Sequence, residues 1–151
     1  MKIIIEVDEN CDEEEIVIRC KELNSTVKNI QNKITEINVS NQELILYRDK
    51  KEYYIDPADI LFFEAEDNIV WAHTIDDIFQ TKYKLYELEK ILPWFFLRIS
   101  KSSILNTNKI YSITKNITSA SKVEFRNTPK NVYVSRSYYK MLMQRLKERR
   151  N

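Results

Sequence analysis

The chain has 151 residues and a mass of 18.2 kDa, a length that suits one domain with a small additional module. Hydrophobic residues make up 43% of the sequence and charged residues 31%, so there are enough large apolar side chains to build a core, which excludes a disordered chain. Glycine is absent, which excludes the glycine-rich phosphate-binding loops of P-loop, dinucleotide-binding and kinase sites.

Histidine and cysteine are scarce, since His73, Cys11 and Cys20 are the complete set. They are too few for a Cys/His zinc site or a histidine-based catalytic triad, so we expect no metal site, no cofactor and no catalytic residues. His73 itself is expected to be structural, because a metal-binding histidine needs further ligands nearby. The N-terminus does not resemble a signal peptide, and we therefore expect a cytoplasmic protein with reduced thiols.

Charge is distributed unevenly along the chain. Residues 1–81 carry 8 Lys/Arg and 19 Asp/Glu, a net charge of −11, whereas residues 82–151 carry 16 and 4, a net charge of +12. A basic half of this kind indicates a surface that binds a polyanion. The alternative is that the two halves neutralise each other within the fold, and charge alone does not separate these interpretations.

The apolar pattern predicts two strands and a helix at the start of the chain. β-Branched residues dominate residues 2–7 and recur over residues 15–20, with an acidic loop between the two segments. From Ser25 the apolar residues take helical spacing, at Val27, Ile30, Ile34 and Ile37. We therefore predict a β-β-α module over residues 1–40, with a role in dimerisation or partner binding, and a second domain over residues 41–151.

Alternation with a period of two predicts that this second domain is mainly β. Two hairpins are expected, 43–47 with 52–55 and 60–64 with 69–74, and the second turns at Asp67-Asn68. A helix over 85–92 ends at Pro93, and a terminal helix runs from the Ser135 cap to about Arg149. The remaining strands are predicted at 95–99, 109–114, 122–126 and 131–134. The fold class is α+β, mainly β.

Four stretches of the second domain resemble the LytTR domain, the DNA-binding module of LytR/AlgR-type bacterial regulators. They are Ile55 to Glu66, Leu85 to Pro93, Phe96 to Asn106 and Val134 to Tyr139, and the resemblance covers roughly residues 45–147. The resemblance implies a multi-stranded β sandwich with short helices. In that fold, loops and the start of a short helix enter successive major grooves, in place of a conventional recognition helix.

The resemblance also implies which residues read bases. Arg136, next to the Ser135 cap, is expected to pair with O6 and N7 of guanine, and the alternative is a solvated arginine. Asn106 is expected to read an adenine edge, although Asn-Thr-Asn also suits an Asx turn. Asn68 and Ile69 are expected to form a third reading loop, in which Ile69 can contact a thymine methyl group.

Four further residues are expected to contact phosphates and so to fix the position of the protein on the duplex. They are Lys101, Arg98, Ser102 and Lys109. The alternative for this group is a solvated basic face.

The sequence departs from the family pattern at two places. Asp67-Asn68 replaces the usual Gly-Asn of the hairpin, and Lys84 replaces a small polar residue at the start of the middle helix.

The function implied by the resemblance is sequence-specific transcription regulation, with two copies bound to direct-repeat promoter sites as a homodimer or pair. A small membrane inhibitor protein is a further partner by family analogy. One alternative is a protein-interaction or antirepressor module in which the acidic half shields the basic half. A second alternative is an enzyme with Glu64 and Glu66 as acid and base, although nothing cleft-like accompanies this pair.

Overall fold

The computed structural model describes residues 2–12, 15–39 and 42–150. Its helices are α1 (Ser25–Val39), α2 (Leu85–Ile91) and α3 (Arg136–Arg150), with short 3-10 helices η1 (Pro57–Asp59) and η2 (Thr107–Lys109). Its strands are β1 (Leu44–Arg48), β2 (Lys51–Ile55), β3 (Phe62–Glu66), β4 (Ile69–His73), β5 (Ile78–Thr81), β6 (Phe96–Arg98), β7 (Ser103–Asn106), β8 (Ile110–Thr114), β9 (Ser121–Phe125) and β10 (Asn131–Val134).

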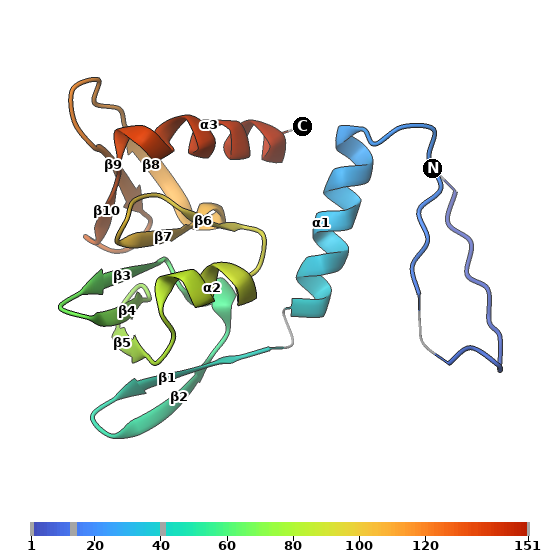
Figure 1. The fold of residues 1–151 in the computed structure, drawn as a ribbon, viewed down its shortest axis with the longest axis horizontal. Coiled ribbons are helices and arrows are strands. Elements are labelled where there is room, and N and C mark those ends of the chain that lie inside the picture. Colours follow the sequence, from blue (N-terminus) through green and yellow to red (C-terminus); the bar gives the residue numbers. More distant parts are fainter. Residues whose placement is uncertain (1, 13–14, 40–41, 151) are drawn as a thin grey trace.

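The described strands form two antiparallel sheets, which confirms the mainly β prediction. The larger sheet has seven strands in the order β2-β1-β5-β4-β3-β7-β6, and the smaller has three in the order β10-β9-β8. Helix α3 lies along the smaller sheet, and α2 lies beside the larger one (Figure 1). The strands β5 and β7 are not predicted by the sequence pattern, whereas both predicted hairpins and both predicted helices of this domain are present.

Strands β3 and β7 of the larger sheet bury side chains on both faces. Phe63 of β3 and Ile104 of β7 belong to one hydrophobic cluster, together with Leu88 of α2. Their chain neighbours Phe62 and Leu105 belong to a second cluster, which includes the smaller sheet and α3. Because successive side chains of a strand point to opposite faces, this sheet separates two cores and holds the smaller sheet and α3 in fixed positions.

The tight hairpin turns form without glycine. Asp67 and Asn68 have φ values of 50° and 65°, and Glu66 pairs directly with Ile69, so the β3-β4 hairpin has a two-residue turn. These are the backbone angles of a type I′ turn, whose twist matches that of the flanking strands. Asp and Asn tolerate the left-handed region better than other side chains. The departure from Gly-Asn therefore leaves the hairpin geometry intact.

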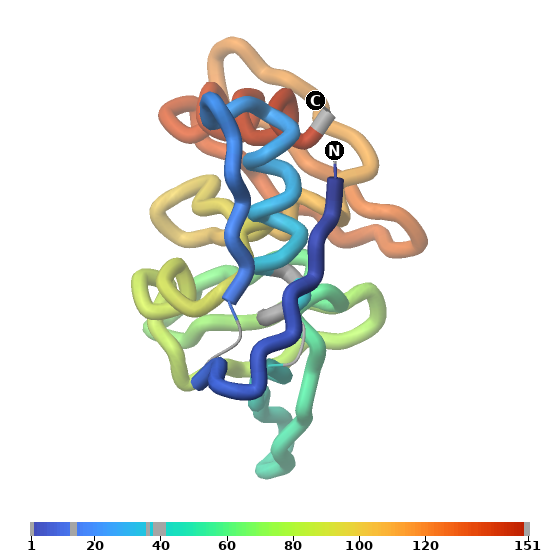
Figure 2. Tube along the Cα trace, turned by 90° about the vertical axis from the view of Figure 1, so that its right-hand side faces the viewer, coloured from blue at the N-terminus to red at the C-terminus, as the bar shows by residue number. Residues whose placement is uncertain are grey.

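The N-terminal module has the predicted helix but, among the described residues, not the predicted sheet. Asn24 caps α1, since its Oδ1 accepts a hydrogen bond from the N–H of Val27 over 3.0 Å. The two segments predicted as strands, which we call the N-terminal arm (residues 2–7 and 15–20), run extended without a described strand partner. Both lie beyond α1, on the side away from the sheets (Figures 1 and 2).

Candidate nucleic-acid interface

Three segments that are far apart in the sequence meet along one edge of the molecule. The N–H of Ala65 in β3 donates to the carbonyl oxygen of Ser102, in the loop between β6 and β7, over 2.8 Å. The N–H of Ser135, just before α3, donates to the carbonyl oxygen of Ile99 over 2.9 Å. We call these segments the reading edge (residues 66–69, 98–102 and 135–137), which follows the left side of Figure 1. Backbone bonds therefore fix its spacing.

Arg136 opens α3 and is exposed at the reading edge. The carbonyl oxygen of Ser135 accepts from the N–H groups of Tyr138 and Tyr139, each over 3.1 Å, so the helix begins where the cap was predicted. Within the described part of the chain, no hydrogen bond or ion pair engages the Arg136 guanidinium. The free N–H groups at the start of a helix also favour a bound anion. The available guanidinium and the helix start therefore both suit an interaction with DNA.

The loop that carries Lys101 is shaped by Arg98. The Arg98 guanidinium donates to the carbonyl oxygens of Ser100 (2.7 Å) and Lys101 (2.5 Å) and forms an ion pair with Glu89 (2.9 Å). Three of its donors are therefore directed into the protein, and its role is to position the loop. The Lys101 side chain is exposed. Ser102 is also exposed, with its hydroxyl 3.3 Å from that of Ser100.

The β3-β4 turn contributes the remaining part of the reading edge. Asn68 is exposed, and Ile69 is 37% exposed although its neighbour Val70 is buried. Glu66 and Asp67 are exposed beside them, so this turn carries negative charge. An amide and an apolar side chain at an acidic turn suit a contact with base edges better than a contact with phosphate.

The structure corrects the prediction for Asn106. Its side chain is fully buried, with Nδ2 donating to the carbonyl oxygen of Ile60 over 2.8 Å and Oδ1 accepting from the N–H of Asn108 over 3.0 Å. A base edge cannot reach this amide, and the Asx turn that the sequence left as an alternative is what forms.

Lys109, half-buried in η2, follows the end of β7 opposite to the reading edge. It is therefore not brought together with Lys101.

Many cations of the basic half are used inside the fold. Lys130 donates to the carbonyl oxygens of Thr74 (2.8 Å) and Asp77 (2.6 Å), and burial lowers the pKa of its ammonium group. Arg149 donates to the carbonyl oxygen of Thr107 over 2.6 Å. Lys140 is exposed one turn along α3 from Arg136 and, among the described residues, has no ion pair. Lys140 was not among the predicted site residues, although its i+4 spacing places it on the same face of α3 as Arg136.

The two acidic residues considered as a catalytic pair lie on β3. Burial, and then the charge of Glu66, raise the pKa of Glu64. The Glu64 carboxylate lies 3.8 Å from Nε2 of His73, whose ring stacks on Phe62 with centroids 4.2 Å apart. Burial, and then the charge of Lys130, lower the pKa of His73 to about 4, so its imidazole is neutral at pH 7. These contacts give His73 a packing role.

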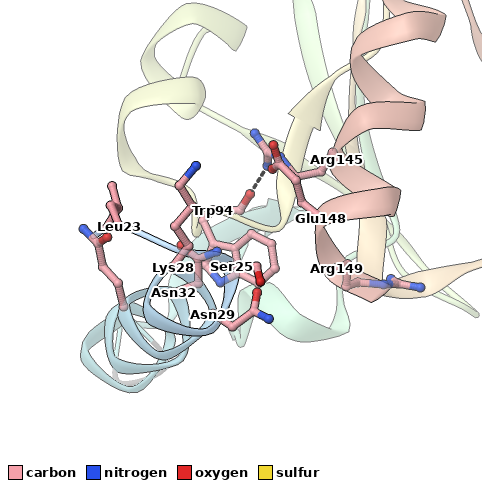
Figure 3. Close-up of a pocket in the computed structure, with 10 residues that line it drawn as sticks. Leu23, Ser25, Lys28, Asn29, Asn32, Trp94, Arg145, Glu148 and Arg149 are labelled. Atoms are coloured by element: carbon pink, nitrogen blue, oxygen red, sulfur yellow. Dashed lines mark hydrogen bonds between the residues drawn. The ribbon is translucent and has the colours of Figure 1, made fainter. Parts of the chain in front are cut away.

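A pocket of about 420 Å³ lies where the start of α1 faces the end of α3. It is lined by Trp94, Lys28, Arg145 and Glu148 among others, and Arg145 donates to the carbonyl oxygen of Trp94 (Figure 3). The reading edge lies at the other end of α3, and a helix of 15 residues is about 22 Å long. Helix α1 and the N-terminal arm are therefore held away from the reading edge.

The described residues contain no group of three or more His, Cys, Asp or Glu residues arranged to hold a metal ion. They also contain no helix with the length and apolar character needed to span a membrane.

Comparison with known proteins gives consistent results. A family model described as the LytTr DNA-binding domain matches residues 50–147. Two proteins named HTH-type transcriptional regulators, from Staphylococcus aureus strains NCTC 8325 and COL, are each 32% identical over 146 residues, which cover 97% of this chain and 98% of the relative. A solved LytTr DNA-binding domain from Bacillus cereus superimposes with a TM-score of 0.65 at 25% identity, covering 70% of this chain and 97% of that one.

Proposed function

The chain belongs to the family of LytTr DNA-binding domains, and we propose that it is a transcription regulator that binds duplex DNA along the reading edge. The observation that carries this proposal is the fixed spacing of three exposed segments, tied together through Ala65–Ser102 and Ser135–Ile99. In the described chain, strands separate each helix from the next, so no pair of helices is joined by the short turn of a helix-turn-helix. Loops and the start of α3 are the parts that enter the grooves.

Each segment of the reading edge has its own task. Arg136 projects from the start of α3 and pairs with guanine through two parallel N–H bonds. Lys101 and the Ser102 hydroxyl contact the phosphates that flank this base, and Lys140 extends the contact along the backbone. Asn68 and Ile69 reach the next groove. Arg98 acts by holding the Lys101 loop, and Lys109 lies outside the contact.

The target and the partners follow from the family. We place the protein in the cytoplasm on direct-repeat promoter DNA, where two copies occupy the two repeats. A small membrane inhibitor protein is a further partner by family analogy. The relatives that match 97% of the chain are named transcriptional regulators, which supports a role on promoter DNA.

The antirepressor alternative is not favoured. It needs the first half of the chain to cover the basic second half, yet the N-terminal arm lies beyond α1, at the far end of α3 from Arg136 (Figure 1). Arg136, Lys101 and Lys140 are exposed. Three exposed cations near one edge produce a positive potential that favours a polyanion.

Selection of bound fragments from a random duplex pool tests the proposal and identifies the operator. The selected duplex, a scrambled duplex of equal length and the selected single strand are then compared by fluorescence anisotropy at two salt concentrations. We expect the selected duplex to bind most tightly and all binding to weaken as salt rises. Failure to retain any duplex at low salt would overturn the proposal.

A further inference from the structure

The N-terminal arm exposes a dense set of apolar side chains. Ile3, Ile5 and Val7 are 84%, 84% and 91% exposed, and Ile16 and Val17 are 68% and 61% exposed. The segments that carry them are extended, and no described strand pairs with their backbone groups. Unpaired extended backbone with exposed β-branched side chains is a template for pairing with another chain. The arm is therefore an interaction surface.

Both segments of the arm alternate with the period of a strand. Ile3, Ile5 and Val7 share one face of the first segment, and Lys2, Ile4 and Glu6 share the other. The second segment repeats this arrangement, with one face formed by Ile16, Ile18 and Cys20 and the other by Glu15, Val17 and Arg19. Each segment thus has an apolar face and a face on which two opposite charges flank a central β-branched residue.

The positions of these charges identify the partner. When residues 15–19 lie antiparallel to the same residues of a second copy, Val17 faces Val17, Ile16 faces Ile18 and Glu15 faces Arg19. Cross-strand pairs of opposite charge and of β-branched residues stabilise a sheet. A two-fold interface requires a surface that is complementary to itself. The segment of residues 15–19 meets this requirement.

The first segment has the same property. Antiparallel pairing about Ile4 sets Lys2 opposite Glu6 and Ile3 opposite Ile5, again with its own copy. Pairing of the two segments within one chain, with Ile4 aligned to Val17, would instead set Lys2 opposite Arg19 and Glu6 opposite Glu15. Like charges in these positions are destabilising. The arrangement of charge therefore favours pairing between copies over pairing within a chain.

We infer that a second copy of this chain covers the N-terminal arm, with residues 2–6 and residues 15–19 each pairing antiparallel with the same segment of the other copy across a two-fold axis. This dimer rests on the proposed function for its purpose, since it joins two DNA-binding domains and raises the effective concentration of the second at an adjacent site. The arm lies at the far end of α3 from Arg136, so pairing leaves both reading edges open (Figure 1).

The mass of the full chain in the absence of DNA tests the inference, by sedimentation equilibrium. We expect twice the 18.2 kDa of the chain. Arg19→Glu sets glutamates opposite each other and should give a monomer, as should Glu15→Arg. The double variant with Arg19→Glu and Glu15→Arg again places opposite charges at positions 15 and 19 of the two copies, so it should be a dimer. A mixture of the two single variants should form a heterodimer, an outcome that only pairing between copies explains.

The first segment is tested in parallel by Lys2→Glu, Glu6→Lys and their combination, with the same expected pattern. Lys21→Glu is the matched control, because it makes the same change of charge just outside the paired residues and should leave a dimer. The arm is exposed, so the thermal melting of the DNA-binding domain should be unchanged in every variant, which separates loss of pairing from loss of folding.

The inference would be overturned if the wild-type chain sediments as a monomer. It would also be overturned if the Arg19→Glu and Lys2→Glu variants both remain dimers. DNA binding is a separate readout. The monomeric variants should bind a duplex with one repeat like the wild type and lose the cooperative gain on a duplex with two repeats. If no chain binds DNA while the masses behave as expected, the proposed function fails and the dimer stands.

Discussion

The N–H of Ser135 donates to the carbonyl oxygen of Ile99 over 2.9 Å, and this bond joins the start of α3 to the loop that carries Lys101. Arg136 directly follows Ser135, and Lys101 lies two positions after Ile99. A residue that reads bases and a residue that neutralises phosphate are thus positioned by main-chain atoms. Replacing either side chain leaves the other in place, so their contributions to DNA binding can be measured separately.

Arg136→Ala should weaken binding to the selected duplex by about 1–3 kcal/mol, because a bidentate contact with guanine is lost. Binding to a scrambled duplex should change much less. Fluorescence anisotropy with both duplexes gives the two free energies. Lys147→Ala is the matched control, since Lys147 is an exposed cation near the other end of the same helix and should matter little. An equal loss on both duplexes would show that Arg136 contacts phosphate instead.

Lys101→Ala should weaken binding to every duplex by a similar factor and reduce the slope of log K against log salt by about 1. The reason is that Lys101 neutralises a phosphate, a contact that carries no sequence information. Lys90→Ala, an exposed lysine on α2 outside the reading edge, provides the comparison. A change in the ranking of duplexes, with an unchanged salt slope, would contradict the assignment.

Asn106→Ala should destabilise the fold without changing which bases are preferred. Removing the amide leaves the buried carbonyl of Ile60 and the N–H of Asn108 without this partner, at a cost of roughly 1–3 kcal/mol for a buried unsatisfied group. Urea unfolding gives the loss of stability, and a repeated selection gives the preference. A changed base preference in a chain of normal stability would restore Asn106 as a reading residue.

The case of Asn106 shows why the sequence predicted the strands better than the site. The alternating pattern predicted both hairpins and the three segments that form the strands of the smaller sheet, because apolar residues recur at every second position along most of these strands. β7 was missed because all four of its residues are buried and two of them, Ser103 and Asn106, are polar. A polar residue after an apolar pair is typical of a surface loop. Only the fold shows that the Asn106 amide is occupied by Ile60 and Asn108.

The basic half and the N-terminal arm show two further limits. Residue counts gave a net charge of +12 for residues 82–151, yet Lys130 and Arg149 donate to carbonyl oxygens inside the fold. Whether a cation is available for DNA depends on tertiary contacts that counts do not contain. The alternation over residues 15–20 predicted a strand, but no partner strand is found among the described residues of a single chain. A strand pattern does not specify which molecule supplies the partner.

The stability of the protein should fall with decreasing pH in a range set by His73. In the folded chain, burial lowers the pKa of His73 to about 4, whereas the unfolded chain has the ordinary value of about 6.5. Between these values the unfolded state binds more protons, so the free energy of unfolding decreases as pH falls, by no more than about 1 kcal/mol per pH unit. Above about pH 6.5 both states are neutral at this residue, and the effect vanishes.

Urea unfolding at a series of pH values from 7 to 5, for the wild type and for His73→Phe, isolates this contribution. The phenyl ring keeps the stacking on Phe62 and does not titrate, while Glu64 and Lys130 remain in place in both chains. We expect the difference in stability between the two chains to shift in favour of His73→Phe as the pH falls, with most of the change below about pH 6.5. A difference that does not vary with pH would mean that His73 keeps its ordinary pKa in the folded protein, with the Glu64 carboxylate offsetting the cost of burial.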